Sequence, residues 1–389
     1  MTGVGERAPA GEQGGPMEKV SQRNTLRRHL LAAAALSFAW IAPAHAAEPA
    51  PAAPLPIRMV IVTAFEVGAD TGDKAGEFQA WATVMPDKIA FPMGFRDLRY
   101  DAKKQALLLS TGVGTNRAAA STMALGLDPR FDLSKAYWMI AAIAGVNPNE
   151  ASLGSAAWIG DVIDSDYGYA VDVREAPKGW TAGQWPRDRS APYQLPRSPE
   201  TSYNLFPVNK GLRDWAYTLT ANVKLADTPD LQKMRATYTG FPKAMEPPKV
   251  IKGDEITGQT FWHGALLNAH FEKWTTYWAG DKARFVMTAM EDSGVIQSIK
   301  MLAKSGKADP QRVLVLRTGS NYSMPSPASG LGAAESLNSE NSGGYSGLQP
   351  SLDAAFIIGG KVVDEITDHW DRYRDTVPGV AAGGASAGP

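Results

Sequence analysis

Two polar motifs follow apolar segments in the C-terminal third of the chain. Met290-Glu291-Asp292 comes directly after the segment 283–289, and Asn321 comes shortly after the segment 312–317. If both segments are parallel strands, these polar groups meet at the carboxyl-terminal edge of the sheet, where α/β proteins bind ligands. Acidic residues at a helix start also stabilise the helix by roughly 0.5–2 kcal/mol, but Asp292 alone meets that need. Glu291 is therefore a candidate ligand-binding residue.

A glycine turn links another apolar segment to a helix. Thr111, Gly112 and Gly114 follow the predicted strand 105–110 and open a predicted helix. Glycines let the backbone approach a ligand closely, and a helix N-terminus favours an anion or a polar oxygen. The third glycine position of the dinucleotide-binding fingerprint holds Arg117, which argues against a nicotinamide cofactor. Arg117 either reinforces an anion site or lies in solvent, and the sequence leaves both interpretations open.

Two further motifs carry weaker signals. His263 and His270 are seven residues apart, whereas zinc ligands on one helix lie three or four apart, so we predict no metal site. His263 stays a candidate binding residue because Trp262 and Gly264 flank it at the start of a predicted element. The tail segment Gly384–Gly388 matches the G-x-S-x-G elbow, but no strand precedes it and no helix follows, so we do not predict a nucleophile there.

Alternating strand and helix patterns predict the scaffold that positions these residues. A strand, a glycine turn, a helix and a second strand form a βαβ unit, which implies a parallel sheet. We predict one α/β domain over 57–375, with a mostly parallel central sheet flanked by helices and a long insertion at about 173–248. The predicted strands are 57–63, 105–110, 136–144, 283–289 and 312–317; the predicted helices are 116–125, 211–221, 230–238, 292–305 and 351–373; residues 157–169 are predicted to form more exposed strand segments and residues 326–350 a loop.

The N-terminus has the pattern of a secretory signal. The basic segment 23–29 precedes the apolar run 30–41, and Ala44-His45-Ala46 supplies small residues for cleavage after Ala46. The apolar run is shorter than the roughly 20 residues that span a bilayer. We therefore predict a signal peptide over 1–46, an Ala/Pro linker over 47–56, a periplasmic or secreted mature chain, and a disordered tail over 376–389.

Charge and composition exclude several classes of protein. The chain has 39 basic and 40 acidic residues, and no long run of one sign, so a dedicated nucleic-acid binder is excluded. Cysteine is absent, which excludes disulfides, thiolate nucleophiles and Cys-ligated zinc. No cofactor is predicted.

Seven motifs together resemble the purine nucleoside permease family. The similarity covers nearly all of residues 57–370, and its most specific motifs are TAMEDSG at 288–294 and RVLVLRTGSNYSMP at 312–325. The other motifs are DKAGEFQAW at 73–81, TGVGTNR at 111–117, LDPRFDLSKAYW at 127–138, AGVNP at 144–148 and FWHG at 261–264. That family in turn resembles the nucleoside phosphorylases and nucleosidases, so the resemblance implies a nucleoside phosphorylase-like fold.

The resemblance also implies roles for individual residues. Met290-Glu291 is similar to the segment that holds ribose, with the glutamate accepting hydrogen bonds from the ribose hydroxyls. Asn321 is similar to the Asp or Asn that faces the purine, and Thr111–Gly114 is similar to the glycine turn near the nucleophile site.

Departures from the family pattern bear on the mechanism. The strand 139–145 lacks the arginine that hexameric phosphorylases carry there, which favours hydrolysis over phosphorolysis unless Arg117 substitutes. Nucleosidases have an aspartate where this chain has Asn321, so Asp292 is the alternative acid. Glu66, after the first predicted strand, is the candidate base that activates water.

Three functions stay open at this point. The first is a secreted enzyme that cleaves purine nucleosides, and the second is a non-catalytic periplasmic binding protein that feeds nucleosides to a membrane transporter. The third is a fold that has lost its chemistry. The expected small-molecule partner is a purine nucleoside or a purine base, and self-association into a homo-oligomer is left open.

Overall fold

The computed structural model describes residues 53–343 and 345–379. The predicted signal peptide and most of the predicted linker lie outside the described residues, and so does most of the predicted tail. None of the helices in the described part of the chain combines the length and the apolar composition that a membrane span needs.

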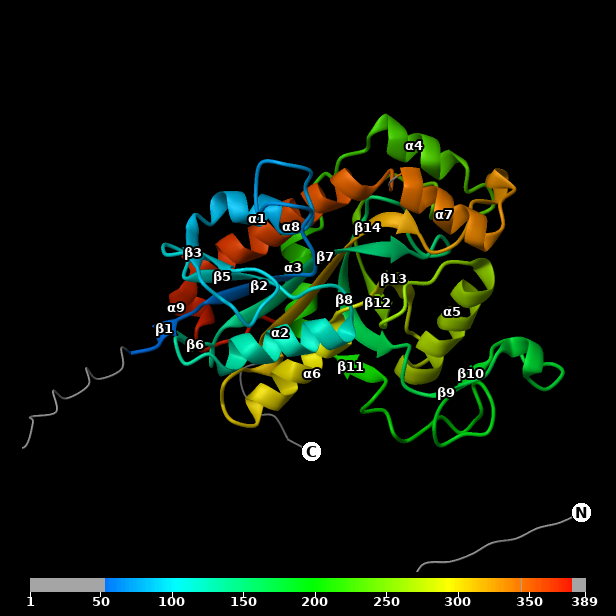
Figure 1. The fold of residues 1–389 in the computed structure, drawn as a ribbon, viewed down its shortest axis with the longest axis horizontal. Coiled ribbons are helices and arrows are strands. Elements are labelled where there is room, and N and C mark those ends of the chain that lie inside the picture. Colours follow the sequence, from blue (N-terminus) through cyan, green and yellow to red (C-terminus); the bar gives the residue numbers. More distant parts are fainter. Residues whose placement is uncertain (1–52, 344, 380–389) are drawn as a thin grey trace, which may run out of the picture. The chain divides into compact units, whose positions relative to one another are not determined.

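Five strands of the central sheet close into a barrel (Figure 1). They are β7 (Tyr137–Val146), β8 (Ala156–Asp164), β12 (Val250–Thr257), β13 (Phe285–Ala289) and β14 (Val313–Tyr322). β8 pairs with β12, β12 with β13, β13 with β7 and β7 with β14, and β14 pairs again with β8. The β13–β7 and β14–β8 pairs are antiparallel and the other three are parallel. The prediction of a mostly parallel sheet is therefore wrong in detail: the fold is α/β, but its core is a closed barrel of mixed strand direction.

Shorter strands extend the sheet from two barrel strands. From β7 the sheet continues through β2 (Met59–Thr63), β5 (Ala106–Ser110), β4 (Leu98–Asp101) and β3 (Asp87–Ile89), while β11 (Leu205–Pro207) pairs with β8. Two small two-stranded sheets lie apart from it: β1 (Leu55–Pro56) with β6 (Phe131–Asp132), and β9 (Tyr169–Ala170) with β10 (Gln184–Trp185). The parallel β2, β5 and β7 match the predicted βαβ unit, whose helix is α2 (Thr115–Leu127).

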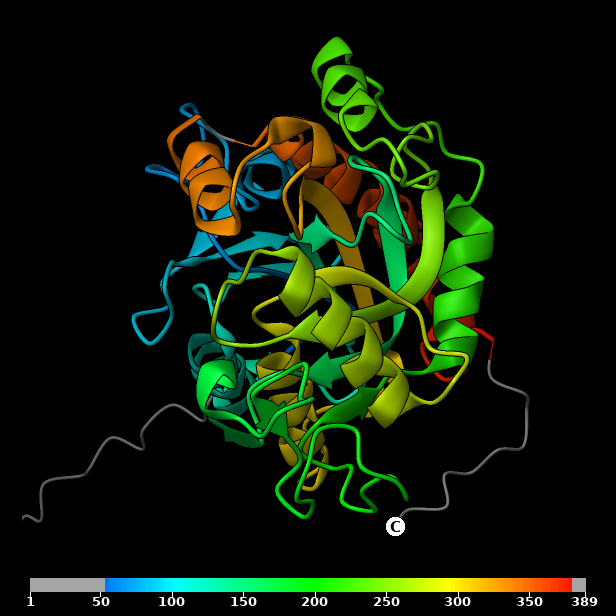
Figure 2. The same cartoon turned by 90° about the vertical axis from the view of Figure 1, so that its right-hand side faces the viewer.

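Helices cover both faces of the sheet (Figures 1 and 2). α2 packs against α6 (Asp292–Ala303) on one side, and α8 (Leu348–Asp368) packs on the other side with α1 (Gln79–Val84) and α3 (Lys210–Thr220). α5 (Ala265–Ala279) contacts β8, β12 and β13. The other helices of residues 53–343 and 345–379 are α4 (Pro229–Ala236), α7 (Ala333–Gly343), α9 (Trp370–Tyr373) and short 3-10 turns at Val173–Glu175, Pro310–Arg312 and Pro327–Ser329.

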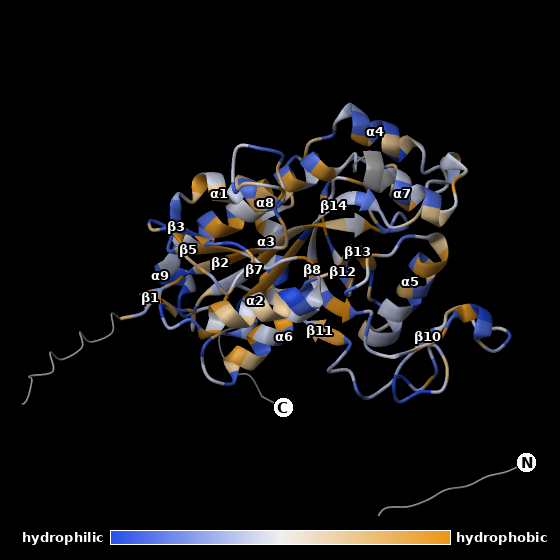
Figure 3. Cartoon of the chain, viewed as in Figure 1, coloured by the Kyte–Doolittle hydropathy of each residue, from blue (hydrophilic) through white to orange (hydrophobic). Residues whose placement is uncertain are grey.

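The sequence of β7 is apolar almost throughout because both faces of this strand are buried. Successive side chains of a strand point to opposite faces, so Trp138 and Ile140 enter one hydrophobic cluster while Tyr137 and Met139 enter another. Both clusters are buried, because helices cover both faces of the sheet. The apolar strands stand out in orange against the mixed colouring of the surrounding helices in Figure 3.

Some predicted elements differ from the structure. β12 has no counterpart among the predicted strands, because its polar residues hide the strand pattern. Asp254, for example, is buried because its two carboxylate oxygens accept hydrogen bonds from the backbone N–H groups of Asp161 and Arg284, at 2.9 and 2.8 Å. β8 is fully buried rather than exposed, the predicted loop 326–350 contains α7, and the predicted last helix is interrupted at His369.

Candidate functional site

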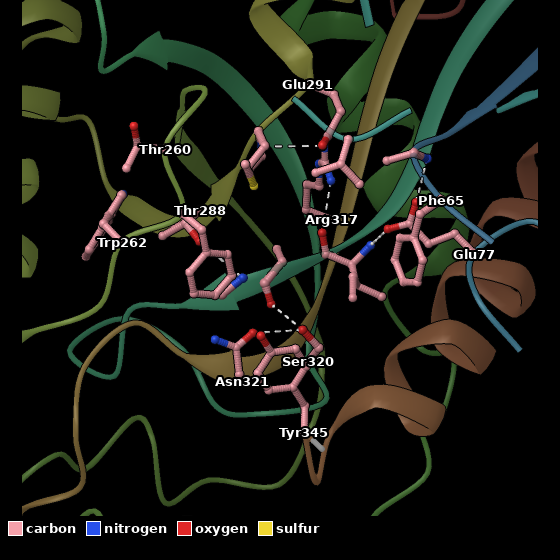
Figure 4. A pocket seen from close by; sticks show the side chains of 18 residues that line it. Phe65, Glu77, Thr260, Trp262, Thr288, Glu291, Arg317, Ser320, Asn321 and Tyr345 are labelled. Carbon is pink, nitrogen blue, oxygen red and sulfur yellow. Dashed lines mark hydrogen bonds and ion pairs between the residues drawn. The ribbon is translucent and has the colours of Figure 1, made fainter. Parts of the chain in front are cut away.

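A cavity of about 270 Å³ opens at the ends of several central strands. β2, β7 and β14 run parallel, so their carboxyl ends meet at one edge of the sheet, and this is where ligand sites form in α/β proteins. Figure 4 shows the side chains around the cavity. The lining residues are Ala64, Phe65, Glu77, Val113, Ile143, Ala144, Gly145, Thr260, Phe261, Trp262, Thr288, Ala289, Met290, Glu291, Arg317, Ser320, Asn321 and Tyr345.

Glu291 links the cavity to the glycine turn. It is the N-cap residue of α6 and lines the cavity, although its side chain is nearly buried. Its Oε1 accepts a hydrogen bond from the backbone N–H of Gly114 at 3.0 Å, and its Oε2 accepts one from Arg317 Nη2 at 2.9 Å. Gly114 has a φ of +99°, in the region that favours glycine, which lets this N–H turn toward the carboxylate. The structure therefore brings Glu291 and the glycine turn together.

Arg317 is the central cation of the site, and it was not among the predicted site residues. It comes from β14, is almost fully buried, and lines the cavity. Its Nη1 donates to the Ile143 carbonyl oxygen at 2.9 Å, and its other nitrogens donate to Glu291 and Asp292. Burial alone lowers the pKa of an arginine, but the carboxylates of Asp292 and Glu291 outweigh burial and raise the pKa of Arg317. The guanidinium is therefore a fixed positive charge.

Asp292 does not reach the cavity. It is the first residue of α6, is fully buried, and directs both carboxylate oxygens to Arg317. The role of Asp292 as an acid for the leaving group stays a prediction, and the structure gives this carboxylate a contact with Arg317 and none with the cavity lining. Its contacts are those of an ion-pair partner.

Glu77 is a second carboxyl at the cavity that the sequence did not point to. Its Oε2 accepts a hydrogen bond from the backbone N–H of Ala64 at 2.6 Å, and its Oε1 accepts one from Ile143 at 2.8 Å. Burial raises the pKa of Glu77 to about 7; the Arg317 charge opposes this rise and the Glu291 carboxylate adds to it. A carboxyl with a pKa near 7 can take or hold a proton at neutral pH.

Glu66, the predicted base, faces its own loop instead. Its carboxylate accepts hydrogen bonds from the backbone N–H groups of Val67, Gly76 and Gln79. These contacts fix the loop between β2 and α1 and leave Glu66 outside the cavity lining. The loop then returns to the end of β2, where the Glu77 N–H donates to the Phe65 carbonyl and the Glu77 carboxylate accepts from Ala64, and so Glu77 takes the position expected for Glu66. Sequence spacing after a strand does not reveal such a return.

Asn321 and Ser320 form the polar side of the cavity opposite Glu77 (Figure 4). Ser320 Oγ donates to Asn321 Oδ1 at 2.9 Å, which fixes the amide orientation. The amide nitrogen of Asn321 donates to its neighbour's carbonyl at 3.3 Å and keeps a second hydrogen for a ligand. The remaining walls are largely apolar and aromatic, from Phe65, Val113, Phe261, Trp262 and Met290. Such walls suit a flat heteroaromatic ring.

Five other predicted residues do not line the cavity, and one of them is Gly114, whose N–H donates to Glu291. The Thr111 hydroxyl donates to the backbone of β2 at 3.2 Å, and Gly112 lies against the ring of Phe95. Arg117 is exposed and donates to the carbonyl of Val113 at 3.1 Å, in the glycine turn that precedes its helix. His263 lies behind the lining residue Trp262, where its Nε2 is 3.0 Å from Ser336 Oγ. Among the residues that the structure describes, no His, Asp and Glu side chains gather as a metal ion would require.

Comparisons with solved structures find similar chains. A 5′-methylthioadenosine/S-adenosylhomocysteine nucleosidase from Neisseria meningitidis is 15% identical, with a TM-score of 0.48 over 80% of this chain and 99% of that chain. A futalosine hydrolase of Helicobacter pylori is 12% identical, with a TM-score of 0.47 over 79% of this chain and 98% of that chain.

Sequence comparisons give the family. A purine nucleoside permease of Candida albicans is 28% identical over 323 residues, which cover 82% of this chain and 77% of that protein. A probable purine nucleoside permease of Schizosaccharomyces pombe is 27% identical over 360 residues, which cover 88% of this chain and 98% of that protein. The family model for purine nucleoside permeases matches residues 56–378. That match extends over most of the sequence and includes all the residues that line the cavity, so the chain belongs to the purine nucleoside permease family.

Proposed function

We propose that this protein binds purine nucleosides in the cavity and cleaves their N-glycosidic bond with water. Family membership supports a nucleoside as the ligand. The observation that carries the proposal of hydrolysis is the position of Glu77, a buried carboxyl with a pKa of about 7 that lines the same cavity as Glu291 and Asn321. A ligand-binding site alone has no need of a base at this place.

The proposed reaction assigns one task to each of these side chains. The Glu291 carboxylate accepts hydrogen bonds from the ribose hydroxyls, and the Asn321 amide donates to a purine nitrogen. Glu77 accepts a proton from water as the water oxygen bonds to the anomeric carbon and the bond from that carbon to the purine nitrogen breaks. The departing purine takes its proton from solvent, and the products are a free base and ribose.

Charge around the cavity favours water over phosphate as the nucleophile. Arg317 is the one cationic side chain among the described lining residues, and it already pairs with the carboxylates of Glu291 and Asp292. A phosphate dianion needs an unengaged cation to replace its hydration. Arg117, the alternative cation, is exposed and pairs with the backbone carbonyl of Val113 in the glycine turn. Water needs only a base and a hydrogen-bond acceptor.

Base release from inosine is expected to be independent of phosphate. The measurement is the rate of hypoxanthine release against phosphate concentration, for the wild type and for Arg117→Ala. Both rates should stay flat, because Arg117 does not line the cavity. A rate that rises to saturation with phosphate in the wild type, and loses that rise in Arg117→Ala, would make the protein a phosphorylase.

Replacing Glu291 with glutamine is expected to weaken the binding of nucleosides and to leave the binding of free bases unchanged. The lost interaction is a hydrogen bond from a ribose hydroxyl to a charged acceptor, which contributes about 1.5–3 kcal/mol, so adenosine should bind roughly ten- to a hundredfold more weakly. Calorimetric titration with adenosine and with adenine measures the difference. An equal loss for both ligands would contradict a contact between Glu291 and ribose.

A binding protein without catalysis is the second candidate, and Asn321 is the residue that favours it. An amide donates a hydrogen bond but does not give up a proton, so it activates a leaving base less than a carboxylic acid does. Saturable adenosine binding with no adenine release at any pH would select this candidate. We propose an extracytoplasmic location for either function, from the signal pattern that ends at Ala46, with a membrane transporter as the partner that takes up the product or the ligand.

A further inference from the structure

A further carboxyl lies beside Arg317, and the proposed reaction does not use it. Glu255 is in the middle of β12 and is fully buried, with its Oε2 3.9 Å from Nε of Arg317. Neither of its carboxylate oxygens has a hydrogen-bond partner at ordinary geometry among the described residues. Leaving a buried polar group unpaired is costly, so a carboxyl in this position calls for a specific explanation.

The charged groups that face Glu255 come from two elements, β14 and the start of α6. Arg317 approaches from β14, and Asp292 and Glu291 approach from the start of α6. The strands on either side of β12 contribute uncharged residues in register, Val162 from β8 and Met287 from β13. Glu255, Asp292 and Glu291 therefore share one guanidinium, and in the described part of the chain Arg317 is the single cation among the charged side chains that face Glu255.

Hydrogen bonds show which carboxyls share the Arg317 charge. Glu291 and Asp292 both accept hydrogen bonds from its nitrogens, whereas Glu255 stays beyond hydrogen-bond distance. Burial raises the pKa of Glu255 well above its ordinary value, and the neighbouring Asp292 carboxylate raises it further. The Arg317 charge opposes this rise without cancelling it. Both the burial of Glu255 and the neighbouring Asp292 carboxylate therefore favour the uncharged form of this side chain.

We propose that Glu255 is a positioning residue that stays uncharged, shares its proton with Asp292, and so leaves the Arg317 charge to Glu291 and Asp292 alone. The inference rests on the proposed function, because its consequence concerns the base. A third carboxylate would take up part of the Arg317 charge, which opposes the rise in the pKa of Glu77, and would so make Glu77 harder to ionise at neutral pH. A neutral Glu255 also gives Asp292 a donor that holds its orientation toward Arg317.

Two substitutions at this position separate charge from shape. Glu255→Gln keeps the shape and a donor without a charge, so the pH midpoint of hydrolysis should stay near the value set by Glu77, with a rate within about threefold of the wild type. Glu255→Leu removes the donor, so kcat should fall about tenfold while KM changes less. Thermal melting checks that both variants fold. A midpoint that drops by about a pH unit in Glu255→Gln would show that the wild-type residue is charged and would overturn the proposal. Equal rates in the two variants would also overturn it.

An infrared spectrum tests the charge of Glu255 without reference to hydrolysis. At about pH 8.5 Glu77 is ionised, so the C=O stretching band of a protonated carboxyl should be present in the wild type and missing in Glu255→Gln. A spectrum in which the two proteins have the same band would overturn the proposal. If the wild type releases no base but keeps this band, the proposed hydrolysis fails while the assignment of the proton to Glu255 stands.

Discussion

Substitution of Glu77 by glutamine is expected to lower the rate of nucleoside hydrolysis by about two to four orders of magnitude. That range is the usual contribution of a positioned general base. Glutamine keeps the side-chain length but accepts no proton, and one of the two backbone N–H groups, of Ala64 or Ile143, would lose its carboxylate acceptor. Nucleoside binding should change far less than the rate, because the proposed ribose contacts belong to Glu291.

The pH dependence of the wild type follows from the same residue. The base acts only when it is ionised, and burial raises the pKa of Glu77 to about 7. Activity should therefore rise as the pH increases, with a midpoint near 7, and not near the ordinary glutamate value of about 4.3. Steady-state rates of base release between about pH 5 and pH 9 measure this midpoint.

Glu66→Gln is the matched comparison for Glu77→Gln. It changes a glutamate of the same loop whose carboxylate accepts backbone hydrogen bonds outside the cavity lining. Its loss of rate should be much smaller, and its pH midpoint should stay near 7. If Glu66→Gln instead loses far more rate than Glu77→Gln, the general base is Glu66, and the proposed role of Glu77 is wrong.

Substitution of Arg317 by methionine is expected to destabilise the fold by about 3–5 kcal/mol. This is the usual cost of removing one member of a buried ion pair, because its partners stay buried without compensation. Here the stranded groups are the carboxylates of Glu291 and Asp292 and the carbonyl of Ile143. The loss should become smaller as the pH falls, since protonation removes the uncompensated negative charge. Urea unfolding of both proteins at several pH values gives the difference.

Arg284→Met is the control for this effect. Arg284 pairs with Glu150, but half of its side chain is exposed to solvent. Pairs of this kind contribute at most about 1 kcal/mol, so the control should unfold close to the wild type. A loss in Arg317→Met as small as that of the control would mean that the carboxyls around Arg317 are already neutral, against the charge distribution described above.

Local sequence patterns predicted the separate elements better than their arrangement. The strand at 57–63 and the helix at 292–305 were readable because apolar runs and helix starts are local features, and both are present as β2 and α6. Barrel closure was not readable, because it depends on β14 pairing with β7 and β8, two strands that lie far earlier in the sequence. β12 was missed because Asp254 and Glu255 break its apolar pattern.

The cavity was also only partly readable from the sequence. Glu291 and Asn321 follow apolar runs in the sequence, and the structure places both at the cavity, Glu291 after β13 and Asn321 near the end of β14. Arg317 and Glu255 were overlooked because they lie inside strands, where residues are ordinarily assigned to the core. Their signal was present all the same: a charged residue in a buried strand requires a partner of opposite charge. An isolated arginine after the run Val313–Leu316 therefore implies buried carboxylates elsewhere in the chain.

The late position of β14 in the chain has a consequence for how the protein reaches its native state. The hydrogen bond from Arg317 to Ile143 spans 174 residues, and β14 is the strand that joins β7 to β8. Contacts of such high sequence separation carry a large loop-closure entropy and slow folding. A chain synthesised from its N-terminus must therefore keep β7 and β8 without their shared neighbour until nearly the whole sequence has emerged. Barrel closure and the arrival of Arg317 at the carboxyls are one event, so a partly folded chain has no ligand site to expose.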